Sequence, residues 1–133
     1  MTNVGSVIYL GGWSGAATVT ATSQHLQQVT TGRVDLFIAA DQEGGAVQQL
    51  KGTGFTTLPN ALRQGTLDSM TLRKQAEGLG RELAAAGVNV DLAPVADTVA
   101  ADFAAHNGPI GKYSRQYGSD PVAVADDVAR RGA

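Results

Sequence analysis

Short apolar runs alternate with longer amphipathic stretches along this chain, and this alternation constrains the fold more than any other feature. The runs cover residues 4–10, 36–40 and 88–95, are bounded by glycine or proline, and have the length of buried strands. Helix patterns lie between and after them. Such alternation predicts a parallel sheet with right-handed crossovers, in either an open doubly wound sheet or a (β/α) barrel.

The clearest helix pattern covers residues 71–86. Its apolar positions recur every three or four residues and form one face, with Gly87 placed as the C-terminal cap: Leu72, Ala76, Leu79, Leu83 and Ala86. Gly78 and Gly80 each cost about 1 kcal/mol relative to alanine inside a helix, and a close approach to the sheet would explain them. A shorter helix is predicted over residues 23–30, with Leu26 and Val29 on one side and Gly32 at its end. A last helix is predicted to begin at residues 119–121.

Three parallel strands cannot close a barrel, which needs about eight. The fold class predicted is therefore α/β, a partial (β/α) TIM-type barrel with parallel strands and about three βα units. All 133 residues belong to this one incomplete domain.

Charge and composition exclude several classes of function. Ten basic and twelve acidic residues give a net charge of -2, and the basic residues are dispersed, so no nucleic-acid surface is expected. The chain has no cysteine, which excludes disulfides and cysteine-ligated metal sites. No apolar run approaches the roughly 20 residues of a membrane span. Residues 1–3 lead directly into a strand pattern without a signal peptide. A cytoplasmic location follows if Met1 is native, while an exported or surface-anchored parent stays open.

Two loops that follow predicted strands are candidates for chemistry, because functional residues of parallel α/β folds gather at the C-terminal ends of strands. In the first, Asp41 ends a strand, and Gly44 and Gly45 let the backbone turn sharply or pass close to a ligand. Asp41 is interpreted either as a turn or cap residue or as a functional acid. Glu43 is interpreted as an acid that organises the loop.

The second loop covers residues 97–118 and contains Arg115, whose guanidinium could hold sugar hydroxyls or form a surface salt bridge. Asp102 and His106 stand four residues apart in it. Two or three such residues in a polar loop are usually solvated, so no metal site is expected. Trp13, after the first strand, could stack on a sugar ring, but it is interpreted as a packing residue.

Four motifs in register resemble those of the family 3 glycoside hydrolases, and most closely those of the bacterial β-N-acetylhexosaminidases. They are Asp-Gln-Glu-Gly-Gly at 41–45, Gly-Phe-Thr-Thr-Leu-Pro at 54–59, Gly-Val-Asn-Val-Asp-Leu-Ala-Pro-Val-Ala-Asp at 87–97, and Ile-Gly at 110–111 with Arg-Gln-Tyr-Gly-Ser-Asp-Pro at 115–121. The resemblance implies a (β/α)-barrel fold and removal of a terminal β-linked N-acetylglucosamine. It implies that Asp41 and Arg115 bind the sugar and that Asp97 orients them. Glu43, the acid that organises the first loop, is expected beside Asp97 in this supporting role.

The chain also departs from that family. Ala46 and Gln49 stand where the family often has arginine, and the later Lys-His-Phe-Pro-Gly segment and the nucleophilic aspartate are absent. No catalytic residue is therefore expected in these 133 residues, which alone should be inactive, and no cofactor or metal is implied. The partner expected is a carbohydrate. The alternative is a non-catalytic sugar-binding or assembly module, a split partial barrel that self-associates or pairs with another chain through open sheet edges.

Overall fold

A three-stranded parallel sheet forms the centre of the computed structural model, which describes residues 4–31 and 34–132. Its strands are β1 (Ser6–Tyr9), β3 (Phe37–Ala40) and β7 (Val90–Asp91), in the order β1-β3-β7. Ser6 pairs with Phe37 and Ala39 pairs with Val90. All three strands fall inside the predicted runs, so the prediction of an α/β fold with parallel strands is confirmed.

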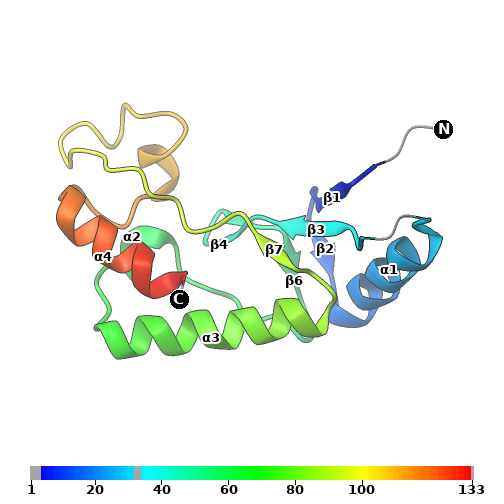
Figure 1. Ribbon diagram of the computed structural model, residues 1–133. Helices are drawn as coiled ribbons and strands as arrows, with labels where there is room; N and C mark the ends of the chain where they lie inside the picture. The colour runs from blue at the N-terminus through cyan, green and yellow to red at the C-terminus, as the bar shows by residue number, and fades with distance from the viewer. Residues whose placement is uncertain (1–3, 32–33, 133) are drawn as a thin grey trace.

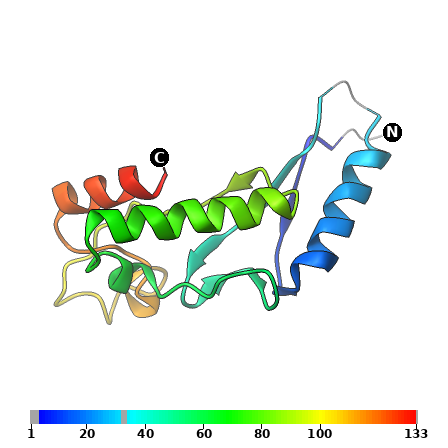
Figure 2. The same ribbon diagram turned by 90° about the horizontal axis from the view of Figure 1, so that it is seen from below.

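Smaller elements surround this sheet (Figure 1). Strand β2 (Trp13–Ser14) pairs in parallel with β6 (Leu50–Lys51), and β4 (Gln42–Gly44) pairs antiparallel with β5 (Val47–Gln48). The helices are α1 (Ala16–Val29), α2 (Ala61–Gln64), α3 (Ser69–Ala85) and α4 (Pro121–Arg131), and Gly111–Tyr113 form one 3-10 turn. Helix α3 lies on one side of the sheet in both views, and α4 packs beside it (Figure 2). No helix in the described ranges is long and apolar enough to cross a membrane.

Helix α1 begins seven residues before the predicted start at residue 23. Its buried residues are Val19 and Ser23, whereas Val29, expected on the apolar side, is exposed. The hydroxyl of Tyr9 shares a hydrogen bond of 2.8 Å with the Ser23 hydroxyl and donates to the Val19 carbonyl at 3.2 Å. This contact holds the first half of the helix against β1. Gly32, expected to end the helix, lies outside the described residues.

Helix α3 matches its prediction closely. Asp68 caps the N-terminus by accepting from the Met70 and Thr71 amides, and Gly87 follows the C-terminus with a φ of 77°. The expected reason for Gly78 and Gly80 is wrong, because a Cβ at either position would meet no atom within 4 Å. These glycines do not allow a close approach to the sheet.

The main core lies on the face of the sheet that α1 and α3 cover. It includes Tyr9, Ile38, Ala40, Leu79 and Leu83. The other face is largely uncovered. Strand periodicity and register place Ile8, Phe37 and Leu92 on it, and all three side chains are exposed. The described part of the chain thus has an apolar sheet face without a covering layer.

Candidate functional site

The loops after β3 and β7 meet at one edge of the sheet, as expected for parallel strands. Asp41 follows β3 directly, and Asp91 is the last residue of β7. The backbone amides of Gln42 and Ala93 both donate to Asp91 Oδ1, at 3.1 and 3.2 Å. The Asp91 carboxylate therefore joins the two strand ends and fixes the position from which Asp41 projects.

The first loop is more regular than the sequence indicated, because Gln42–Gly44 and Val47–Gln48 form a short hairpin. Gly44 ends β4 and Gly45 begins the turn, with φ angles of 100° and 60° that residues other than glycine rarely adopt. A Cβ on Gly45 would lie 2.7 Å from Asn60 Cβ, and one on Gly44 would run into the Pro59 carbonyl. The paired glycines thus allow a close approach to the segment at 58–60.

Glu43 and Arg115 form a two-pronged ion pair across 72 positions of sequence. Arg115 Nε donates to Glu43 Oε2 at 2.8 Å, and Arg115 Nη2 donates to Glu43 Oε1 at 2.6 Å. The Glu43 side chain is only 5% exposed and that of Arg115 26%. A third bond runs from Arg115 Nη1 to the Pro109 carbonyl at 2.9 Å. Glu43 therefore does organise this loop, and it does so by holding Arg115.

The charge around Arg115 is strongly negative. The hydrogen bonds to Glu43 raise the pKa of Arg115, burial opposes this, and the charges of Glu43, Asp41 and Asp97 raise it further. A guanidinium has five N–H donors, and three are engaged here, so Nη1 and Nη2 each retain one donor. Of the two roles left open by the sequence, the structure shows the ion pair, and two N–H groups of Arg115 have no partner among the described residues.

Asp41 and Asp97 complete the set of four expected site residues. Asp41 is half-buried, and within residues 4–31 and 34–132 no hydrogen bond or ion pair engages its carboxylate. Asp97 is exposed in the loop after β7. Both act on Arg115 through their charges. The structure thus brings one free carboxylate and one pre-oriented guanidinium to the same edge of the sheet.

Two residues of this edge, Asp91 and Arg131, were not singled out from the sequence. Burial raises the pKa of Asp91, and the bond from the Gln42 amide and the positive charge of Arg131 oppose that rise. Arg131 is buried at the end of α4, and its Nη2 donates to the Gln42 carbonyl at 2.8 Å. In the sequence, the only feature that could have indicated Asp91 was the presence of an acid inside the apolar run at 88–95. No sequence feature indicated Arg131.

The remaining interpretations concern the second loop and Trp13. Trp13 packs edge-on against Tyr9 with ring centroids 4.9 Å apart, which confirms its packing role. The His106 ring stacks on Phe103, 6.1 Å between centroids. In the part of the chain that the structure describes, no group of three or more histidine or acidic residues could hold a metal ion.

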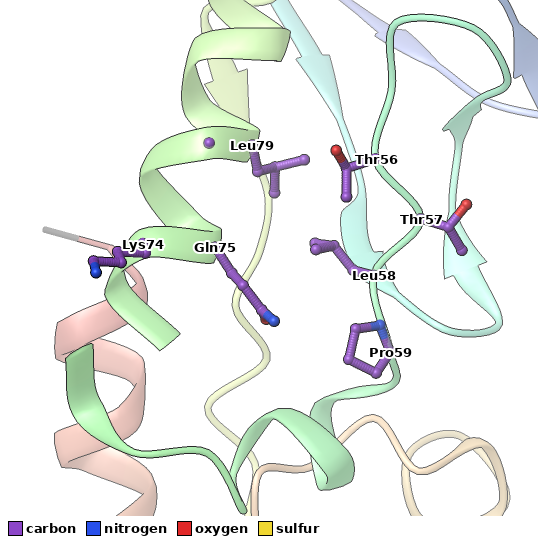
Figure 3. Close-up of a pocket in the computed structure, with 8 residues that line it drawn as sticks. Thr56, Thr57, Leu58, Pro59, Lys74, Gln75 and Leu79 are labelled. Atoms are coloured by element: carbon purple, nitrogen blue, oxygen red, sulfur yellow. The ribbon is translucent and has the colours of Figure 1, made fainter. Parts of the chain in front are cut away.

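A separate pocket of about 250 Å³ lies between α3 and the segment at 56–59 (Figure 3). Thr56, Pro59, Lys74 and Leu79 are among the residues that line it. The Gln75 side chain extends toward Leu58 and Pro59. None of the four expected site residues lines this pocket, so it is distinct from the edge that carries Asp41 and Arg115.

Residues 1–130 match the glycosyl hydrolase family 3 N-terminal domain. The chain is 33% identical over 94 residues to the β-hexosaminidase LpqI of Mycobacterium tuberculosis, which covers 70% of this chain and 23% of that protein.

Solved structures agree in fold. The β-N-acetylhexosaminidase of Beutenbergia cavernae DSM 12333 is 43% identical with a TM-score of 0.86, over 96% of this chain and 39% of that one. A family 3 β-N-acetylglucosaminidase of Paenibacillus sp. str. FPU-7 is 30% identical with a TM-score of 0.81, over 97% of this chain and 24% of that one. The chain therefore spans well under half the length of these relatives.

Proposed function

The chain belongs to glycosyl hydrolase family 3, and from this premise we propose that it is part of the catalytic barrel of a β-N-acetylhexosaminidase and contributes the side chains that hold the terminal sugar. The names of its relatives support this activity. The three parallel strands and their helices correspond, in this proposal, to the first βα units of the barrel.

One observation carries the proposal: the unengaged carboxylate of Asp41 and the pre-oriented guanidinium of Arg115 share one edge of the sheet. A carboxylate accepts two hydroxyl hydrogen bonds, and the two remaining N–H groups of Arg115 donate to neighbouring hydroxyl oxygens. Together they select the face of the sugar that points inward. Glu43 prevents Arg115 from collapsing onto Asp41, because it already neutralises the guanidinium.

The proposed reaction removes a terminal β-linked N-acetylglucosamine with retention of configuration. A carboxylate attacks the anomeric carbon as the aglycone oxygen receives a proton, and water then releases the sugar from the glycosyl-enzyme. We place that nucleophile and the acid/base in segments outside these 133 residues. Asp41 and Arg115 accelerate both steps to the extent that they bind the distorted sugar of the transition state more tightly than the ground state. No metal or organic cofactor enters this scheme.

The test uses the full-length enzyme that carries this domain and an aryl β-N-acetylglucosaminide. Asp41→Ala should lower kcat/KM by about tenfold to a hundredfold, because hydrogen bonds to a charged group contribute roughly 1.5–3 kcal/mol. Its melting temperature should stay unchanged, since no described residue bonds to that carboxylate. Asp102→Ala, an exposed acid of the second loop, is the matched control. A wild-type enzyme without activity on this substrate, or unchanged efficiency in Asp41→Ala, contradicts the proposal.

A second function, self-association of this chain as a module, is favoured by the uncovered sheet face with Ile8, Phe37 and Leu92. Strands β1 and β7 also have no outer neighbour in the described sheet. Sedimentation of the isolated chain distinguishes the two functions. A stable dimer that Phe37→Asp converts to monomer supports the module. A monomer, together with activity of a longer chain, supports the enzyme.

A further inference from the structure

We propose that Gln64 is a positioning residue for the Glu43–Arg115 pair, and that it acts by coupling the two loops of the site. This inference rests on the proposed function, because Arg115 matters there as a ligand for the sugar. Gln64 is the last residue of the four-residue helix α2, which no periodic pattern in the sequence predicted. It lies between the two loops and belongs to neither.

The side chain of Gln64 is fully engaged. Its Nε2 donates to the Glu43 carbonyl at 2.8 Å and to the Pro59 carbonyl at 2.7 Å, while its Oε1 accepts from the Tyr117 hydroxyl at 3.0 Å. Gln64 is 1% exposed, so water does not replace a lost partner easily. One donor and the acceptor of the amide thus connect the two loops, and the second donor holds the side chain to the preceding segment at Pro59.

These bonds close a ring around Arg115. The ring runs from the Glu43 carbonyl through Gln64 to Tyr117, along two residues of backbone to Arg115, and back to the Glu43 carboxylate. Each loop is therefore held to the other at a second point besides the ion pair. The bond from Arg115 Nη1 to the Pro109 carbonyl holds the guanidinium within its own loop, whereas the ring through Gln64 restricts movement of the two loops relative to each other.

The backbone of α2 supports the same segment. The Leu62 amide donates to the Ser114 carbonyl at 3.2 Å, and Ser114 adopts a left-handed conformation with φ of 54° directly before Arg115. Gly65 lies so close to the Tyr117 carbonyl that a Cβ there would collide with it. Helix α2 thus contacts residues 114–117 on both sides of Arg115, and Gln64 is its only side chain that also reaches Glu43 among the described contacts.

Gln48 provides a matched control. It is 4% exposed, and its amide also makes three hydrogen bonds, to Leu50 O at 3.2 Å, Thr56 O at 2.9 Å and Leu58 N at 3.1 Å. All three partners lie within the segment at 50–58. Replacing Gln48 therefore removes as many buried hydrogen bonds as replacing Gln64, but it leaves the connection to Tyr117 intact.

The experiment compares Gln64→Met, Tyr117→Phe and Gln48→Met in the full-length enzyme. Methionine preserves the volume of glutamine and removes its hydrogen bonds. Gln64→Met should raise KM for an aryl β-N-acetylglucosaminide about tenfold, since the sugar must then pay for ordering Arg115. Tyr117→Phe should raise KM less, because it removes one of the three hydrogen bonds of Gln64. Gln48→Met should leave KM within about twofold. It should lower only the fraction of enzyme that is folded, and this lowers the apparent kcat.

A second readout does not depend on activity. The Nε–H resonance of Arg115 in arginine-labelled enzyme should exchange slowly with water in the wild type and in Gln48→Met, and faster in Gln64→Met and Tyr117→Phe. A wild-type enzyme that is inactive refutes the proposed function, while this resonance still decides on Gln64. Unchanged exchange in both Gln64→Met and Tyr117→Phe, or equal acceleration in Gln48→Met, overturns the positioning role. Should Gln64→Met fail to fold, Tyr117→Phe alone decides.

Discussion

The Glu43–Arg115 pair should contribute measurably to stability, unlike an ordinary surface ion pair. Two charges about 4 Å apart attract by about 4 kcal/mol at an effective dielectric constant of 20. Arg115 is 26% exposed, and both ions lose hydration on pairing, so the net coupling should be about 2 kcal/mol. Glu43→Gln, Arg115→Met and the double variant form a double-mutant cycle, which isolates the coupling free energy between the two side chains. Urea denaturation followed by circular dichroism gives each free energy of unfolding.

Arg73 and Glu77 on α3 are the matched control. They also form an ion pair, at 3.4 Å, but their side chains are 60% and 45% exposed. The same cycle on this pair should give about 0.3–0.5 kcal/mol, and 0.5 M salt should remove most of it. If the Glu43–Arg115 coupling is no larger than that of Arg73–Glu77, then burial does not strengthen the pair, and our account of how Arg115 is held is wrong.

Three further predictions concern the helices, the strand ends and the activity. Gly80→Ala should raise the free energy of unfolding by about 0.5–1 kcal/mol, because its Cβ meets no atom, whereas Gly65→Ala should lower it by about 1–3 kcal/mol through its collision with the Tyr117 carbonyl. Because burial raises the pKa of Asp91 above 3.8, the contribution of Asp91 to stability is most favourable below that pH and declines as the pH rises through the folded-state pKa. Urea denaturation from pH 3 to 7 should therefore show Asp91→Asn gaining stability relative to wild type as the pH rises, and a constant difference would contradict this. The 133-residue chain alone should release no chromophore from an aryl β-N-acetylglucosaminide above a buffer control.

The strands and α3 could be predicted because each has a local signal. Buried parallel strands leave short continuous apolar runs, and α3 leaves a stripe of regularly spaced apolar residues, so each can be read from the local sequence. The first half of α1 leaves no such pattern. Val19 and Ser23 are its buried residues, and serine is buried there only because Tyr9, ten or more residues away, supplies a hydrogen bond. Tertiary contact overrode the local preference of a segment rich in threonine.

The residues of the site also divide into those with a local sequence signal and those placed by tertiary contacts. Asp41 and Arg115 could be located, because a strand end and a family motif mark them, but the sequence carries no sign that Arg115 pairs with Glu43. Gln64 could not be found at all. A glutamine that bonds to backbone carbonyls has no characteristic neighbours in sequence, and a four-residue helix is too short to show a period. Long-range hydrogen bonds between polar side chains and backbone therefore depend on the folded structure and leave no mark in the local sequence.

The bond from Arg131 to the Gln42 carbonyl has a consequence for synthesis on the ribosome. Its two ends are 89 residues apart, and translation at about 5–20 residues per second separates their appearance by about 4–18 s. During that interval β1, β3 and α3 can already assemble, while the peptide unit next to Asp41 still faces water. The order of emergence thus makes the edge that carries Asp41 the last part of this chain to mature, and a nascent chain arrested before Arg131 should show this edge as its most protease-sensitive region.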